Sequence, residues 1–138
     1  MPTRSTIRIL IIDDNLLLLA ATKMMLGSCK DFTVVGEAST ALTGIKMALT
    51  LQPDVVLMDI NMKPIDGIEA TRKLLSQCPA IVVIGFSALP YPQQEQEMID
   101  AGAKAVVCKS ANKQVICNTI ISYYRHHITD DDSRRMEN

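Results

Sequence analysis

The sequence has few aromatic residues and almost no net charge. Its 138 residues include no Trp, three Tyr and two Phe, and the formal net charge is −1. A nucleic-acid-binding domain usually carries a clear excess of Lys and Arg, and one that binds single strands needs aromatic side chains on which bases stack. The composition therefore argues against direct nucleic-acid binding by this domain.

Long apolar runs and paired cysteines are also missing. No apolar run approaches the roughly 18–20 residues that cross a bilayer. Residues 1–6 are too short and polar for a signal peptide. We therefore expect no membrane contact and a cytoplasmic location. The four cysteines are scattered and form no CxxC pair, so in a cytosolic chain we interpret them as free thiols rather than as bridges or metal ligands.

What the chain does have is the composition of an ordinary globular domain, with 48% apolar and 21% charged residues. Short apolar runs alternate with stretches typical of helices. The predicted strands cover residues 7–12, 32–37, 54–58, 80–86 and 103–108. The predicted helices cover residues 16–27, 40–51, 68–77, 93–101 and 112–124. This alternation predicts an α/β fold with five βα units and a parallel sheet that helices cover on both faces.

The domain organisation follows from the same pattern. We expect an N-terminal extension over residues 1–6, one domain over residues 7–125 and a polar C-terminal tail over residues 126–138. Either Asn15 or Asp14 is expected to cap the first helix, and Ser39 or Thr40 the second, because short polar side chains accept hydrogen bonds from the first free N–H groups of a helix.

The stretch PDVVLMDINMKPIDG, from Pro53 to Gly67, carries the central site residue. Its branched apolar run predicts a short buried strand that ends in the carboxylate Asp59. Open α/β sheets place their ligands at the carboxyl ends of their strands. The position of Asp59 therefore predicts a functional site.

Other polar residues also follow predicted strands. Asp13 and Asp14 follow the first strand, Ser87 the fourth and Lys109 the fifth. Since the carboxyl ends of parallel strands meet at one edge, we expect these residues to lie near Asp59. A single Asp after a strand is commonly a helix cap, but capping does not explain polar residues at the ends of four strands.

Three carboxylates at one edge repel one another. Two unit charges ~4 Å apart cost about 4 kcal/mol at an effective dielectric constant of ~20. A hard divalent cation with oxygen ligands, such as Mg²⁺, relieves this cost. A phosphoryl group fits beside Mg²⁺, Lys109 and Ser87, and Asp59 is then the candidate nucleophile that forms an aspartyl phosphate.

From Ile7 to Tyr124 the chain resembles the receiver domain of two-component response regulators. The matching residues are Asp13-Asp14, Asp59 within MDINMKPIDGIEA, Ser87-Ala88, Ala101-Gly102-Ala103 and Lys109. The resemblance implies a flavodoxin-like (βα)5 doubly wound parallel sheet, the CheY-like fold, with strand order 2-1-3-4-5. It also implies a signalling switch that catalyses only its own phosphorylation and dephosphorylation.

The resemblance further implies roles for individual residues. Asp59 would accept the phosphoryl group from a sensor histidine kinase or a histidine phosphotransfer protein. Asp14, Asp59 and the backbone carbonyl of Asn61 would hold Mg²⁺, and Asp13 would reach it through water. Ser87 and Lys109 would contact the phosphoryl group.

The sequence departs from the family at several positions. Val106, three residues before Lys109, replaces the usual Tyr or Phe, so the ring movement that reports phosphorylation is not available and Ser87 with its following loop would have to report it. Leu89 is predicted to hinder the hydrolytic water and lengthen the life of the phosphorylated state. Lys63-Pro64 predicts an altered turn. Lys109-Ser110 resembles receivers that precede helix-turn-helix domains, which leaves a DNA-binding transcriptional regulator open as the longer protein.

Two other functions and one surface remain as alternatives. A Mg²⁺-dependent aspartyl-phosphate phosphatase would want Asp where Asn61 stands. A flavodoxin-like cofactor binder would want a Ser/Thr/Gly-rich loop after the first strand, where Asp13-Asp14 would repel phosphate. Leu16–Leu19 with Tyr123 and Tyr124 form either a homodimer surface or an ordinary core with one leucine facing outward.

Overall fold

The computed structural model describes residues 5–89 and 91–136, with side chains described as far as Thr129. Strands and helices alternate through this part of the chain. They are β1 (Ile7–Ile12), α1 (Leu16–Gly27), β2 (Phe32–Ala38), α2 (Ala41–Leu51), β3 (Val55–Asp59), α3 (Gly67–Gln77), β4 (Val82–Ser87), α4 (Pro92–Asp100), β5 (Ala105–Cys108) and α5 (Lys113–Met136). The predicted order of elements is confirmed, and apart from the end of α5 the predicted ends agree to within two residues.

The strands form one parallel sheet in the order β2-β1-β3-β4-β5. This confirms the predicted strand order. In the register, Ile12 pairs with Met58 and Asp59 pairs with Phe86. Ser87 pairs with Cys108, the residue before Lys109. The carboxyl ends of β1, β3, β4 and β5 therefore meet at one edge of the sheet.

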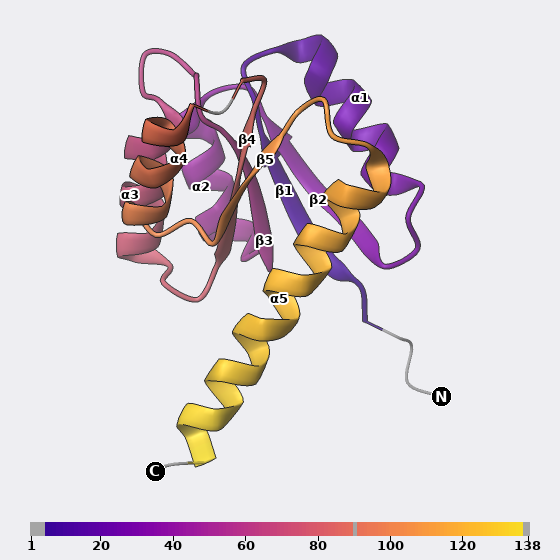
Figure 1. The fold of residues 1–138 in the computed structure, drawn as a ribbon, viewed down its shortest axis with the longest axis vertical. Coiled ribbons are helices and arrows are strands. Elements are labelled where there is room, and N and C mark those ends of the chain that lie inside the picture. The colour runs from indigo at the N-terminus through magenta and orange to yellow at the C-terminus, as the bar shows by residue number, and fades with distance from the viewer. Residues whose placement is uncertain (1–4, 90, 137–138) are drawn as a thin grey trace.

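Alternate residues of the strands enter two hydrophobic cores, because successive side chains of a strand point to opposite faces. Leu10, Val56 and Val83 belong to the core with apolar residues of α2, α3 and α4. Ile9 and Leu57 belong to the core with apolar residues of α1 and α5. Figure 1 shows the same division, with α2, α3 and α4 on one side of the sheet and α1 and α5 on the other.

Polar side chains fix the starts of the helices that leave the functional edge. Asn15 Oδ1 accepts a hydrogen bond from the Leu18 N–H at 3.0 Å, so Asn15 rather than Asp14 caps α1. Thr40 caps α2 and Asp66 caps α3 in the same manner. Because the caps set where each helix begins, they also set the length of each loop that follows a strand.

Helix α5 is longer than predicted. The predicted helix ends near Tyr124, whereas α5 continues to Met136 and its end extends beyond the sheet (Figure 1). Residues 125–136 contain neither Gly nor Pro, so nothing in the backbone stops the helix at the point where its apolar face ends. The polar tail predicted from residue 126 therefore lies mainly within this helix. Residues 1–4 of the predicted N-terminal extension lie outside the described residues.

The leucines at the start of α1 are divided between solvent and core. Leu16 and Leu17 have 68% and 82% of their surface exposed, whereas Leu19 is buried. Two leucines thus face outward, not the single one of the simpler alternative. Tyr123 of the neighbouring α5 is 39% exposed. Within residues 5–89 and 91–136, no helix has both the length and the apolar character required to cross a membrane.

Candidate functional site

Asp59 lies at the end of β3, a strand that is buried along its whole length between β1 and β4. Its side chain is 5% exposed. Its Oδ1 atom accepts a hydrogen bond from the Asn61 N–H at 3.2 Å and lies 3.2 Å from Lys109 Nζ. One oxygen of the carboxylate is thus held by two donors, and no described residue donates a hydrogen bond to Oδ2.

Two more carboxylates come from the end of β1. Asp13 is buried, and its Oδ1 accepts a hydrogen bond from the Asn15 N–H at 2.9 Å. Asp14 is exposed. One oxygen from each of Asp13, Asp14 and Asp59 lies within 4.8 Å of the other two. The predicted clustering of these carboxylates is therefore present in the structure.

Lys109 joins two of the carboxylates. Its Nζ lies 2.9 Å from Asp13 Oδ2 and 3.2 Å from Asp59 Oδ1, and its side chain is only 11% exposed. The backbone N–H of Lys109 donates to the Ser87 carbonyl at 2.7 Å, which fixes the end of β5 against the end of β4. The ammonium also lies 5.8 Å from the centre of the Phe86 ring, within the range of a cation–π contact.

Ser87 is fully buried at the same edge. Its hydroxyl oxygen has no hydrogen-bond partner among the described residues. A buried hydroxyl without a partner costs about 1–3 kcal/mol, so Ser87 is expected to gain a partner such as a water, an ion or a ligand. The structure places Ser87 where the sequence predicted it, and leaves its hydroxyl unpaired.

The environment of Asp59 disfavours its charged form. The pKa of its carboxyl is raised from 3.8 to about 6, chiefly by burial and next by the negative charge of Asp13. Lys109 and the hydrogen bond from the Asn61 N–H act in the opposite direction and lower the pKa. Asp59 is therefore ionised at neutral pH, but at a cost that a bound cation would remove.

The donors at this edge suit a hard divalent cation. Three carboxylates face one ammonium group, so negative charge remains uncompensated when all are ionised. Each of the three aspartates can provide a carboxylate oxygen as a ligand. In proteins Mg²⁺ is commonly bound by a few carboxylates, with water completing its coordination. The residues present therefore fit the predicted magnesium site.

The loop after β3 approaches Asp59 closely. A Cβ atom on Gly67 would lie 2.2 Å from the Asp59 carbonyl oxygen, so this position admits no side chain. The Lys63–Pro64 peptide is cis, whereas the Lys109–Ser110 peptide is trans. Sequence reasoning missed the function of Gly67 in this packing, because its close neighbour is backbone.

A second contact was also missed. The side chain of Asn61 turns toward α4, where its Oδ1 accepts a hydrogen bond from Gln94 Nε2 at 3.0 Å. Nothing in the Gln- and Glu-rich sequence of α4 distinguishes Gln94 from its neighbours.

Val106 packs against the core that contains Met98 of α4. Leu89 is 68% exposed on the loop that follows β4.

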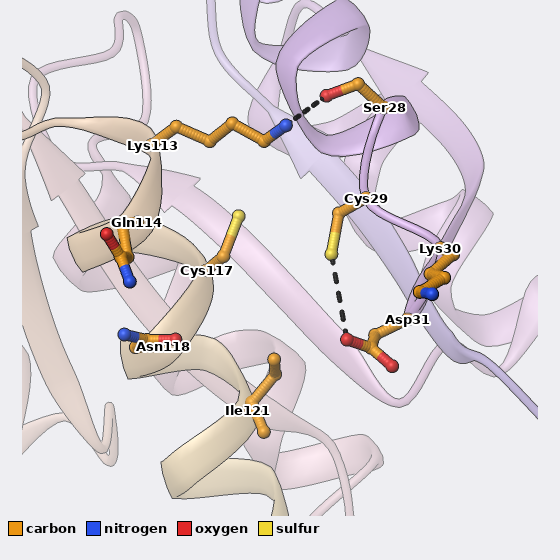
Figure 2. Close-up of a pocket in the computed structure, with 9 residues that line it drawn as sticks. All are labelled: Ser28, Cys29, Lys30, Asp31, Lys113, Gln114, Cys117, Asn118 and Ile121. Carbon is orange, nitrogen blue, oxygen red and sulfur yellow. Dashed lines mark hydrogen bonds between the residues drawn. The ribbon is translucent and has the colours of Figure 1, made fainter.

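A cavity of about 550 Å³ lies elsewhere in the molecule, between the loop after α1 and the start of α5 (Figure 2). Cys29 and Cys117 line it, and Lys113 Nζ donates to Ser28 Oγ at its rim. None of the residues predicted for phosphoryl chemistry belongs to its lining. We therefore assign the candidate site by its carboxylates, its ammonium and its unpaired hydroxyl, not by the size of a cavity.

Known proteins with similar sequences are response regulators. The chain is 38% identical over 105 residues to the response regulator GacA of Pseudomonas viridiflava. The aligned region covers 76% of this chain and 49% of GacA. It is 32% identical over 114 residues to the transcriptional regulatory protein LiaR of Bacillus subtilis (strain 168), covering 83% of this chain and 54% of LiaR. The chain thus spans about half the length of these curated relatives.

A solved structure shows the same fold. The receiver domain of the putative response regulator NarL from Mycobacterium tuberculosis superposes with a TM-score of 0.84 at 22% identity, over 88% of this chain and 98% of that domain. The family model of the response regulator receiver domain matches residues 9–121. The chain therefore belongs to the family of response regulator receiver domains, which act as phosphoacceptor switches in two-component signalling.

Proposed function

We propose that Asp59 is the phosphoacceptor of this receiver domain. The proposal rests on the contacts that surround the Asp59 carboxylate. One oxygen is held by Lys109 and the Asn61 N–H, and the edge also contains the buried unpaired hydroxyl of Ser87. A carboxylate among a cation and hydrogen-bond donors at the end of a buried strand is suited to accept a phosphoryl group.

The two oxygens of Asp59 have different tasks in this proposal. Oδ1 is held by its two donors, so Oδ2 is the oxygen that attacks phosphorus. In this step the Oδ2–P bond forms and the bond between phosphorus and the donor breaks, and the bonding electron pair leaves with the donor. For a histidine kinase or a histidine phosphotransfer protein the broken bond is P–N, and for acetyl phosphate it is P–O. The chain catalyses this transfer to itself and the later hydrolysis, and acts on no separate metabolite.

Asp13, Asp14 and Asp59 would hold Mg²⁺, with the backbone carbonyl of Asn61 as a further ligand. The bound ion would offset the charge of the carboxylates and of the incoming phosphoryl oxygens. Lys109 lies close enough to two carboxylates to remain in the site and pair with a phosphoryl oxygen. The Ser87 hydroxyl would donate to another phosphoryl oxygen and so gain the partner that it lacks.

The proposed partners follow from the family. A receiver domain implies a histidine kinase as its phosphoryl donor. We propose that the longer protein is a DNA-binding regulator, which is supported by relatives that extend to about twice the length of this chain and by the name of LiaR as a transcriptional regulatory protein. A homodimer through Leu16–Leu19, Tyr123 and Tyr124 stays a prediction, and of these residues Leu16, Leu17 and Tyr123 are exposed. A cytoplasmic location also stays a prediction.

One experiment tests the acceptor. The intact protein is incubated with acetyl phosphate and Mg²⁺, and mass spectrometry follows the added phosphoryl group. We expect labelling of the wild type and of the control Asp100→Asn, whose carboxylate lies exposed at the end of α4, and no labelling of Asp59→Ala. Labelling that persists in Asp59→Ala would refute the acceptor assignment. A wild type that takes up no phosphoryl group from this donor or from a phosphohistidine protein would refute the function.

A further inference from the structure

Among the described residues, one hydrogen bond connects the loop beside the phosphoacceptor to helix α4. Gln94 Nε2 donates to Asn61 Oδ1 at 3.0 Å, across 33 positions of sequence. Among the described residues, the other polar side chains of α4 that form hydrogen bonds do so within the helix. Gln93 donates to Glu97, and Gln96 donates to Asp100. Gln94 thus differs from its neighbours in reaching out of the helix.

At the other end of this hydrogen bond, Asn61 lies next to the phosphoacceptor Asp59. Its backbone N–H donates to Asp59 Oδ1 at 3.2 Å. A change in the charge or ligands of the Asp59 carboxylate alters this hydrogen bond directly. Because the side chain of Asn61 is attached to the same backbone unit, a movement of Asn61 pulls on Gln94.

Helix α4 is held weakly enough to respond. Met98 is the one residue of α4 that is buried, and it enters the core beside Thr71. Gln94 lies one turn before Met98 and therefore on the same face of the helix. The capping position, Tyr91, makes no side-chain hydrogen bond to the helix. The start of α4 is thus attached to the phosphoacceptor loop by Gln94 and to the core by Met98, and elements with few buried contacts shift at low cost.

Within the described part of the chain, only one of the two polar atoms of the Gln94 amide forms a hydrogen bond. Its Oε1 atom is buried without a hydrogen-bond partner among the described residues. An unpaired buried acceptor is unfavourable, so an arrangement that brings a donor to Oε1 would gain a hydrogen bond that the present one lacks. The contact therefore has a physical reason to change when the loop moves.

We propose that the hydrogen bond from Gln94 to Asn61 couples the state of the phosphoacceptor site to the position of α4. Gln94 is a positioning residue in this proposal, because it acts on the site through Asn61. It supplies a route for the signal in a chain where Val106 cannot provide a moving ring. The part that concerns phosphorylation rests on the proposed function, whereas the coupling to the metal can be measured without it.

Coupling of this kind is reciprocal. If a bound cation favours one position of α4, then that position of α4 favours binding of the cation by the same factor. Removal of the Gln94 amide that connects the two should therefore change the affinity of the site for the cation. A net contribution typical of one hydrogen bond corresponds to roughly a 2–10-fold change in affinity. The two directions of the coupling therefore provide two independent measurements.

The test compares Gln94→Ala with Gln96→Ala, which removes an amide of the same kind that bonds within α4. Backbone amide NMR resonances are followed during a Mg²⁺ titration and again after incubation with acetyl phosphate. In the wild type and in Gln96→Ala we expect resonances of Ile99 and Asp100, at the far end of α4, to shift with site occupancy. In Gln94→Ala we expect these shifts to disappear and the Mg²⁺ dissociation constant to differ roughly 2–10-fold from the wild-type value.

A second variant separates coupling from damage to the helix. Asn61→Ala removes the acceptor and leaves α4 unchanged, so it should abolish the same distant shifts, and the double variant Asn61→Ala/Gln94→Ala should show no further loss. Additive effects of the two substitutions, or distant shifts that persist in Gln94→Ala, would overturn the proposal. If the wild type binds Mg²⁺ and shifts α4 but takes up no phosphoryl group, the proposed function fails and the coupling stands.

Discussion

The substitution Asp59→Asn should stabilise the metal-free protein at neutral pH. The ionised Asp59 carboxylate is buried and lies beside Asp13, and these two conditions raise its pKa to about 6 from an ordinary value of 3.8. A folded protein that raises the pKa of a carboxyl binds that proton more tightly than the unfolded chain does. Stability that is fully present below pH ~4 is therefore lost as the pH rises through about 6. An asparagine keeps the neutral shape and avoids this loss.

The size of the effect follows from the shift. A difference of about 2 pKa units corresponds to about 3 kcal/mol. Water reaches the exposed side of the carboxylate cluster at Asp14 and screens part of this energy, so we expect a gain of about 1–2 kcal/mol for Asp59→Asn at pH 7.5. For a domain of this size such a gain raises Tm by about 4–8 °C.

Urea unfolding followed by circular dichroism measures this difference at a series of pH values in the presence of a chelator. The advantage of Asp59→Asn should shrink as the pH falls from 7.5 to 4, because Asp59 in the wild type then becomes neutral as well. The exposed Asp100→Asn serves as the control and should change the free energy of unfolding by less than about 0.5 kcal/mol. An Asp59→Asn variant that is no more stable than the wild type at pH 7.5, or whose advantage is the same at pH 4, would refute the reasoning.

Three further outcomes follow from individual contacts. Leu89→Glu should shorten the life of the phosphorylated state, as measured by loss of label after the donor is removed, because a polar side chain no longer hinders the hydrolytic water; equal lifetimes would contradict this explanation. Iodoacetamide should modify Cys108 before Cys117, since hydrogen bonding to Ser110 lowers the pKa of the Cys108 thiol and burial raises that of Cys117, and peptide mapping that shows the reverse order would be the contrary result. Gly67→Ala should lower Tm and weaken Mg²⁺ binding, since its Cβ would meet backbone at 2.2 Å, and a variant with wild-type values of both would show that the loop adjusts freely.

The sequence predicted the fold and the clustering of the carboxylates for the same physical reason. Strands of a parallel sheet all end at one edge, so the order of elements alone brings Asp13, Asp59 and Lys109 together, although they span 97 positions of the chain. No side-chain conformation has to be known for that inference. The magnesium ligands and the separate roles of Ser87 and Lys109 came from the family resemblance, and they stay predictions.

What the sequence could not provide depends on individual side chains. The choice of Asn15 over Asp14 as the cap of α1 is decided by loop geometry, because both residues can accept the same hydrogen bond. The contact between Gln94 and Asn61 depends on which of several similar amides faces the site. The prediction that the last helix ends near Tyr124 was wrong because the apolar pattern stops there, whereas the helical backbone continues through polar residues that include no Gly or Pro.

The length of α5 gives that helix two halves with different sources of stability. Its first half is buried through Ile116 and Ile120, whereas its end extends beyond the sheet. A segment of about twelve residues is only marginally helical on its own, because starting a helix is costly and extending one is not. The packed inner half therefore stabilises the helical conformation of the outer half, because the two halves share one continuous series of backbone hydrogen bonds. Any event that loosens the packing of α5 against the sheet should also melt the outer half, so the helicity of this segment reports the state of the domain at a distance from the phosphoacceptor.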